Sequence, residues 1–172
     1  MRLHKKIVPN IARDIVTALV DNGDIEVGEE TIRAAEQDFE AILAEYQRRE
    51  SELHEFAREL LVSRGWSASR YSEARRLAAA NRKLPVDDDG LDFVINQMLE
   101  FMMLSKNIDE VFAEDHVMRK RIADVIRGYL KLDEEVEEEV RKRLKHLEEG
   151  TRDWEVAYRK TLEEVRRAKG LT

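Results

Sequence analysis

The chain of 172 residues carries 30 Lys and Arg against 37 Asp and Glu, so its formal charge is −7, and 42% of its residues are hydrophobic. This length suits one compact domain or two small ones, and the apolar fraction excludes a wholly disordered protein. The absence of cysteine excludes disulfide scaffolds, zinc–thiolate sites, iron–sulfur clusters and thiol catalysis.

Long helices are predicted because 7 Gly and 2 Pro fall far below the usual usage of about 7% and 5%. The first predicted helix covers residues 9–21 and ends at Asn22-Gly23, and a connector over 24–28 leads to a long helix over 29–62. A break near Glu50-Ser51, a candidate N-cap, would shorten this helix. Its apolar stripe has the three-four spacing of a coiled coil and consists of Ile32, Ala35, Phe39, Ile42, Tyr46, Leu53, Phe56 and Leu60.

A second set of helices follows a boundary rich in Pro and Asp at residues 84–90. The helix predicted over 90–105 is apolar almost all round, so we expect it to be the most buried segment. The next long helix is predicted over 116–147, with Asp133 as a candidate N-cap inside it. Each long helix is followed by one more helix, and these two cover residues 69–81 and 151–169.

The two sets resemble each other at an offset of 83 residues, without a gap from about residue 8 to about residue 61. The connector 24–26 falls on residues 107–109, and Tyr46 falls on Tyr129. Because the match keeps its phase through a connector, we predict an internal duplication.

Catalytic motifs are not found. The glycines are isolated, which excludes a phosphate loop or a dinucleotide fingerprint, and the helix after His54 has Arg58 where a zinc protease needs its second His. The remaining candidate is Glu114-Asp115-His116, whose carboxylates and imidazole are suited to binding a metal or moving a proton. Acidic residues at a helix start also cap backbone N–H groups, and this structural role is the favoured interpretation.

Three basic stretches stand out in this acidic chain. They contain the candidate interaction residues Arg2, Lys5, Lys6, Arg75, Arg76, Arg82, Lys83, Arg119, Lys120 and Arg121. One interpretation is a basic face for RNA, the ribosome or an acidic partner. The other is solvated helix surface whose ion pairs form within the fold or across a dimer, for example with the acidic run 133–139. The net charge and the aromatic content of 6% favour the second interpretation.

Four segments carry a resemblance to a known family: RLHKKIVP at 2–9, SKNIDEVFAEDH at 105–116, LEEGT at 147–151 and RRAKG at 166–170. On these segments the chain resembles, over essentially its whole length, the bacterial family called domain of unknown function 507. The resemblance implies a small bacterial cytosolic helical protein with related halves, and it brings no activity, cofactor or site residue with it.

These observations predict an all-α protein, an elongated bundle of two related helix-hairpin units over 1–84 and 85–172, either separate or packed as one domain. No apolar run reaches the roughly 18 residues of a membrane span, and polar residues interrupt any signal-peptide core, so we expect a cytoplasmic protein.

The predicted function is that of a non-enzymatic interaction or assembly protein without a cofactor. Its partner would be another protein or a second copy, joined as a homodimer through the heptad-patterned helices. The first alternative is an RNA- or ribosome-associated factor that uses the basic residues, and the second is a metal-binding or enzymatic protein that uses the region Glu114–His116.

Overall fold

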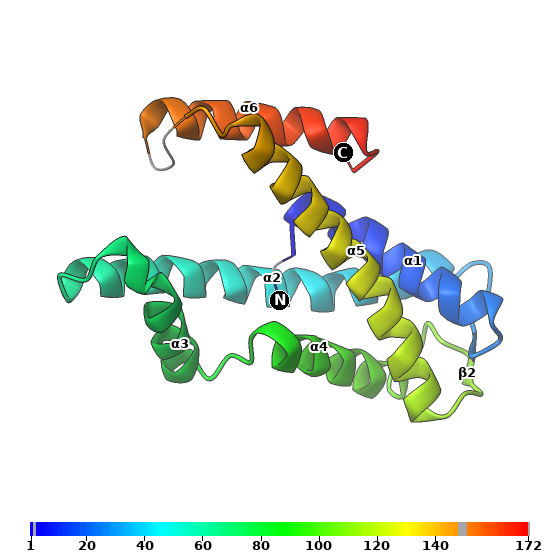
Figure 1. Cartoon of the computed structure of the whole chain (residues 1–172). Helices are drawn as coiled ribbons and strands as arrows, with labels where there is room; N and C mark the ends of the chain where they lie inside the picture. The colour runs from blue at the N-terminus through cyan, green and yellow to red at the C-terminus, as the bar shows by residue number, and fades with distance from the viewer. Residues whose placement is uncertain (2, 148–150, 172) are drawn as a thin grey trace. The chain divides into compact units, whose positions relative to one another are not determined.

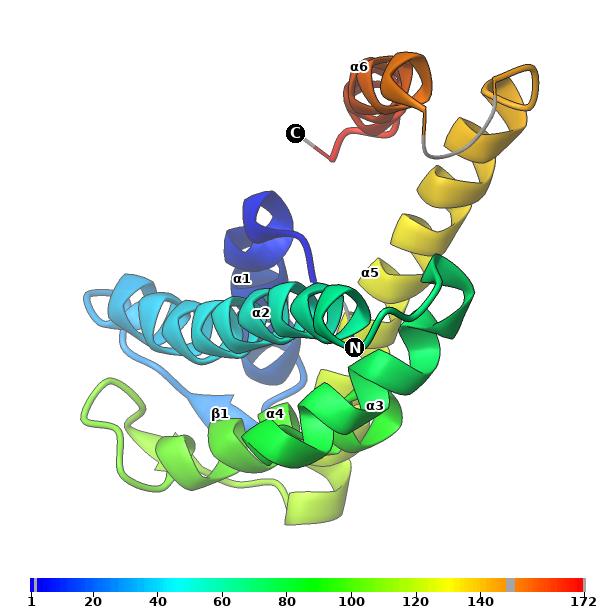
Figure 2. The same ribbon diagram turned by 90° about the vertical axis from the view of Figure 1, so that its left-hand side faces the viewer.

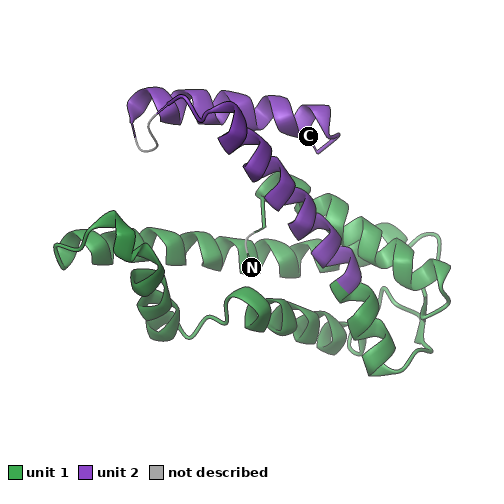
Figure 3. Ribbon diagram, viewed as in Figure 1, with its two compact units in different colours: residues 1–123 green, residues 124–172 purple. Residues whose placement is uncertain are grey.

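The computed structural model describes residues 1, 3–147 and 151–171 and is predominantly helical, so the predicted all-α fold is confirmed. The chain divides into two compact units (Figure 3), which are residues 1–123, here called unit 1, and residues 124–172, here called unit 2.

Unit 1 begins with a 3-10 turn, η1 (Lys5–Ile7), and helix α1 (Val8–Asp21), which has Pro9 in its first turn. The buried face of α1 contains Ile11, Ile15 and Leu19 at helical spacing, and it packs against α2. The helix ends at Asn22, and Gly23 follows at φ +69°, a conformation that glycine adopts without strain.

Helix α2 (Ile32–Ser63) runs through unit 1 without a break. The predicted interruption at Glu50-Ser51 is therefore wrong, because Glu50 turns its carboxylate to the side and pairs with Arg75 instead of ending the helix. Four members of the predicted apolar stripe are buried within the chain itself: Ala35, Phe39, Tyr46 and Leu53.

Helix α3 (Tyr71–Arg82) follows a 3-10 turn, η2 (Ala68–Arg70), and packs back against α2. Its buried residues include Ala74 and Ala78, and α2 contributes the buried Ala57. Small side chains of this kind let two helices approach closely.

Helix α4 (Asp87–Met102) then runs alongside α2, as both ribbon views show (Figures 1 and 2). It begins three residues earlier than predicted, so three aspartates lie in its first turn, where the helix dipole favours negative charge. The expectation that residues 90–105 are the most buried segment is wrong at its end, because Met103 and Leu104 are 72% and 83% exposed.

A two-stranded antiparallel ribbon joins the connectors that follow α1 and α4. Strand β1 (Ile25–Glu26) pairs with β2 (Glu110–Val111), with Ile25 opposite Val111. The sequence did not predict this ribbon. Beside it, Asp24 is buried and accepts a hydrogen bond from the guanidinium of Arg121 at the start of α5.

Helix α5 (Asp115–Arg143) crosses the division between the units, and α6 (Arg152–Ala168) completes unit 2. The candidate N-cap Asp133 lies inside α5, which does not break there. The core of unit 2 is formed by Val136, Val140, Leu144, Val165 and Leu171.

The compact units differ from the predicted halves 1–84 and 85–172, because unit 1 also contains α4 and the start of α5. Each predicted half nevertheless contains a helix, a short strand, a long helix and a further helix in the same order. The internal duplication itself stays a prediction.

Candidate interaction site

An apolar groove of about 310 Å³ lies between α2 and α4 in unit 1. Its lining comes from two stretches of these helices and consists of Asp38, Ala41, Ile42, Glu45, Tyr46, Arg49, Phe93, Val94, Gln97 and Phe101. Ile42, Phe93 and Phe101 are only half-buried, so each presents part of its apolar surface to the groove.

The aromatic floor of the groove is held in place by one close approach. The Tyr46 ring lies against Phe93, with the ring centroids 6.4 Å apart, and the Tyr46 hydroxyl donates a hydrogen bond to the Pro85 carbonyl oxygen at 3.1 Å. Gly90 makes this approach possible, because a Cβ atom there would come within 2.1 Å of the Tyr46 hydroxyl oxygen. Burial raises the pKa of Tyr46 to about 12, so the hydroxyl keeps its proton at neutral pH.

Charged side chains occupy the rim of the groove in a fixed order along α2. Asp38 accepts a hydrogen bond from the Asn107 side-chain amide at 2.6 Å. Glu45 accepts one from Arg48 at 2.7 Å, and this bond holds the pKa of Glu45 below its usual value. Arg49 lies over the Phe93 ring, 5.8 Å from its centroid. Asp38 therefore makes one end of the rim acidic, and Arg49 makes the other end basic, while Glu45 between them is paired with Arg48.

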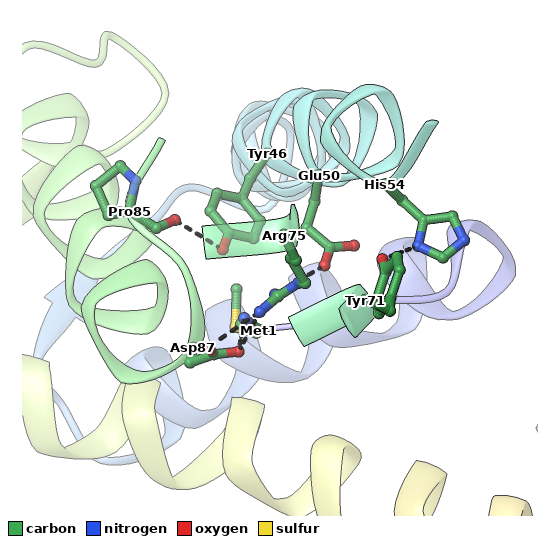
Figure 4. A network of polar contacts seen from close by, with 8 residues as sticks. All are labelled: Met1, Tyr46, Glu50, His54, Tyr71, Arg75, Pro85 and Asp87. Atoms are coloured by element: carbon green, nitrogen blue, oxygen red, sulfur yellow. Dashed lines mark hydrogen bonds and ion pairs between the residues drawn. The ribbon is translucent and has the colours of Figure 1, made fainter. Parts of the chain in front are cut away.

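A polar network next to the floor ties α2, α3 and α4 together (Figure 4). The Arg75 guanidinium on α3 donates to Glu50 of α2 at 3.3 Å and to Asp87 of α4 at 3.1 Å, and the Met1 amine lies 3.6 Å from Asp87. The hydrogen bond from Arg75 lowers the pKa of Asp87. Because Glu50 and Arg75 are largely buried, this network fixes the spacing of the three helices that shape the groove.

A second cavity, of about 490 Å³, opens beside this network and is lined by Glu50, Ser51, His54, Glu55, Arg58, Tyr71, Arg75 and Asp87. His54 Nδ1 contacts the Tyr71 hydroxyl there. In the part of the chain that the structure describes, no three His, Asp or Glu side chains gather closely enough to hold a metal ion.

The comparisons with known proteins point to one family. Residues 1–171 match the family described as "Protein of unknown function (DUF507)". The chain belongs to this family. The resemblance seen in the sequence is thereby confirmed over the whole length. No curated protein is similar enough to this chain to count as a match. Within residues 1, 3–147 and 151–171, no helix is both long and apolar enough to cross a membrane.

In this DUF507 protein, none of the predicted interaction residues that the structure describes lines the groove. The side chains of Lys5, Lys6, Arg76, Arg82, Lys83 and Lys120 are exposed. Arg75, Arg119 and Arg121 pair with carboxylates of unit 1, and Arg2 lies outside the described residues. The charge of Arg75 is used to join three helices, and that of Arg121 to hold Asp24 beside the ribbon.

The candidate chemical residues Glu114 and His116 lie 3.3 Å apart at the start of α5, and both are largely exposed. Asp115 is the first residue of α5 and pairs with Arg119, one turn further along. The three side chains therefore lie on the open surface of a helix start and line neither of the two cavities described above.

Sequence reasoning missed the groove because Ile42 was assigned to a coiled-coil stripe, and because Phe93 and Phe101 lie in the helix over 90–105 that was expected to be the most buried segment. One signal was available. A helix that is apolar all round has more apolar surface than one buried face needs, and the excess on α4 lines the groove.

Proposed function

We propose that this protein is a non-enzymatic interaction protein that binds an amphipathic helix of a partner protein in the groove between α2 and α4. The observation that carries the proposal is the half-buried aromatic lining of a groove of about 310 Å³ that runs between two helices. Grooves of this kind accept the apolar face of a third helix, whose anchors recur at positions i, i+3 or i+4, and i+7.

The rim defines the chemistry of the partner helix. Asp38 favours a basic residue at one end of it, and Arg49 favours an acidic residue at the other. Asp38 and Arg49 are 11 residues apart on α2, about 16 Å along the helix axis. A partner helix of about three turns therefore matches both ends of the rim.

The groove is a better protein-binding surface than the heptad stripe of α2. Ala35, Phe39 and Leu53 of that stripe are already covered by the chain's own helices. A two-chain coiled coil through them would require unit 1 to open and lose this burial. We propose that the protein acts in the cytoplasm, because a chain without cysteine has no disulfide bonds that the reducing conditions there would break.

The test uses a matched pair of substitutions on α2. Ala41 and Ala44 are both exposed alanines, but of the two only Ala41 lines the groove. Ala41→Arg fills the groove and neutralises its acidic end, whereas Ala44→Arg adds the same side chain outside it. Both substitutions cost little in helix propensity.

The probe is a labelled 14-residue peptide designed as an amphipathic helix with leucine anchors, an arginine at one end and a glutamate at the other. Fluorescence anisotropy measures its affinity. We expect Ala41→Arg to weaken binding at least tenfold and Ala44→Arg to change it less than twofold. Equal effects of the two substitutions would exclude the groove as the binding site. Equal binding of a peptide of the same composition, with its leucines spread around the helix, would also exclude the groove as the binding site.

A further inference from the structure

The end of α2, the turn after it and the whole of α3 together have a charge opposite to that of the rest of unit 1. Residues 58–83, here called the basic hairpin, contain 7 Lys and Arg against 2 Glu, a formal charge of +5, while the whole chain carries −7. The flanking parts of unit 1, residues 1–57 and 84–123, carry −6 and −5. The positive potential is therefore concentrated on one segment of an acidic unit.

Three arginines of the basic hairpin lie over aromatic rings. The guanidinium carbons of Arg70 and Arg64 lie 3.7 Å and 5.0 Å from the ring centroid of Trp66, and that of Arg82 lies 5.0 Å from the centroid of Phe56. Arg70 also donates two hydrogen bonds to the Glu73 carboxylate, both at 2.8 Å, so its edge is already engaged. A guanidinium that lies over a ring can still direct the N–H groups of its edge to phosphate oxygens, as we expect for Arg64 and Arg82. All three arginines are exposed.

The end of the hairpin adds further contact surface. Trp66 is half-buried, Val62 is 84% exposed, and the exposed Ser67 and Ser69 have their hydroxyl oxygens 2.6 Å apart. Unpaired bases stack on aromatic rings and on guanidinium planes alike, and hydroxyl groups bind phosphate or ribose. The surface thus combines the groups that bind a single strand, namely cations for its backbone and planar groups for its bases.

We infer that the basic hairpin binds single-stranded RNA, through Arg64, Arg76, Arg82 and Lys83 on the phosphates and through the Trp66–arginine stack on a base. An acidic protein segment would use the positive charge but not the stacking planes. The acidic flanks of unit 1 repel a polyanion, so the site extends over a few nucleotides only. This inference does not depend on the groove.

The first experiment measures the anisotropy of a labelled 12-nucleotide oligouridine at salt concentrations between 50 and 200 mM. Each phosphate contact to a single strand contributes about 0.7 to the slope of log affinity against log salt, so four contacts give a slope of about −3. Arg64→Ala with Arg82→Ala should reduce its magnitude by about 1.4. The control, Arg152→Ala with Arg159→Ala, removes two exposed arginines from α6, and we expect it to leave the slope unchanged.

The second experiment detects stacking through the fluorescence of Trp66 in a Trp154→Phe protein, because the chain contains 2 Trp. We expect oligouridine to quench this fluorescence and polyglutamate of equal charge to leave it unchanged. Equal losses in the hairpin and control variants would overturn the inference, since binding would then follow net charge alone. Polyglutamate that binds as tightly as oligouridine, with no quenching by either, would instead assign the surface to an acidic protein. Ala41→Arg should leave RNA binding intact, which separates this result from that of the groove.

Discussion

In the α2–α3 hairpin of unit 1 and the α5–α6 hairpin of unit 2, a long helix is held to the next helix by an ion pair and by apolar packing, but in different proportions. Each long helix carries a largely buried carboxylate that pairs with an arginine of the helix that follows it. Glu50 meets Arg75 at 3.3 Å, and Asp133 meets Arg166 at 2.8 Å. Glu50 and Asp133 are 83 residues apart, which is the offset of the internal similarity.

The packing around these pairs differs. The first hairpin closes through small residues such as Ala57 and Ala78, and its arginine also reaches Asp87 of α4. The second closes through Val136, Val140 and other branched side chains, and Tyr158 adds a hydrogen bond to Glu137 at 2.5 Å. The first hairpin therefore uses its ion pair to position a third helix and the groove beside it, while the second is held together by its own apolar core.

The largest effect is expected from the ion pair of the second hairpin. Arg166→Met leaves the Asp133 carboxylate, whose side chain is 14% exposed, without this arginine. We expect the free energy of unfolding to fall by about 3 kcal/mol, measured by urea denaturation with Trp154 fluorescence in a Trp66→Phe protein. Adding Asp133→Leu should restore most of the loss, because an apolar pair replaces a buried ion pair at little cost. A loss below about 1 kcal/mol would mean that water already solvates the pair.

The two hairpins should differ in which change of side-chain volume lowers their stability. Ala78→Leu overfills the contact between α2 and α3 and should cost about 2 kcal/mol, whereas Ala80→Leu, exposed on the same helix, should cost less than about 0.5 kcal/mol. In the second hairpin a loss of volume is the damaging change, so Val140→Ala should cost about 2 kcal/mol. Urea denaturation followed by circular dichroism measures all three. If Ala78→Leu is tolerated as well as Ala80→Leu, the first hairpin is not closely packed.

Substitution of Gly90 should have a smaller effect on stability, and this effect is specific to the groove. Gly90→Ala places a Cβ atom against the Tyr46 hydroxyl and breaks its bond to Pro85, at a net cost of about 1.5 kcal/mol after the gain in helix propensity. Gly128→Ala is the matched control. No atom lies within 4 Å of a Cβ built there, so this change should stabilise α5 by about 0.7 kcal/mol. Thermal unfolding of both proteins is the measurement, and stabilisation by Gly90→Ala would contradict the described floor of the groove.

The smallest effect is a pH dependence of the first hairpin. The hydrogen bond from Arg75 lowers the pKa of Asp87 below its usual 3.8, so the folded state binds this proton less readily than the unfolded state. The resulting stability is present above about pH 4 and is lost as the pH falls through the lowered pKa. Because the Asp87 side chain is 70% exposed, we expect less than about 1 kcal/mol.

Asp87→Asn should remove this part of the pH dependence between pH 2.5 and 5, and Asn tolerates the φ of +54° at this position as Asp does. The exposed neighbour Asp88 provides the control substitution, Asp88→Asn. Urea denaturation across this pH range measures both proteins. Identical pH profiles for wild type and Asp87→Asn would show that the Arg75 bond has no effect on stability.

Much of the fold could be predicted from the sequence because helices have a local signal. The apolar period that predicted a helix over 29–62 corresponds to α2 at Ile32–Ser63, since that period depends only on neighbouring turns. The β1–β2 ribbon has two residues per strand, too few for any period, and it pairs positions more than 80 residues apart. Glu50 was interpreted by local capping rules, whereas its partner Arg75 lies 25 residues away.

The position of the groove could not be predicted for a related reason. Whether Phe93 belongs to a core or to an open lining depends on the distance between α2 and α4, which Gly90, Tyr46 and Pro85 set together. The charges were visible in the sequence, but their pairing was not. Arg75 and Arg76 are neighbours in the chain, yet the first is tied to two carboxylates and the second is exposed.

The ribbon between β1 and β2 also determines the order in which the chain can fold during synthesis. Asp24 and its partner Arg121 are 97 residues apart, so α1 and β1 leave the ribosome long before the residues that complete their surroundings exist. At about 5–20 residues per second, this delay lasts roughly 5–20 seconds. Throughout that time the Asp24 carboxylate lacks its arginine and strand β1 lacks its neighbour. Although the ribbon is only two residue pairs long, it means that unit 1 completes its fold only after residues 110–121 have been synthesised.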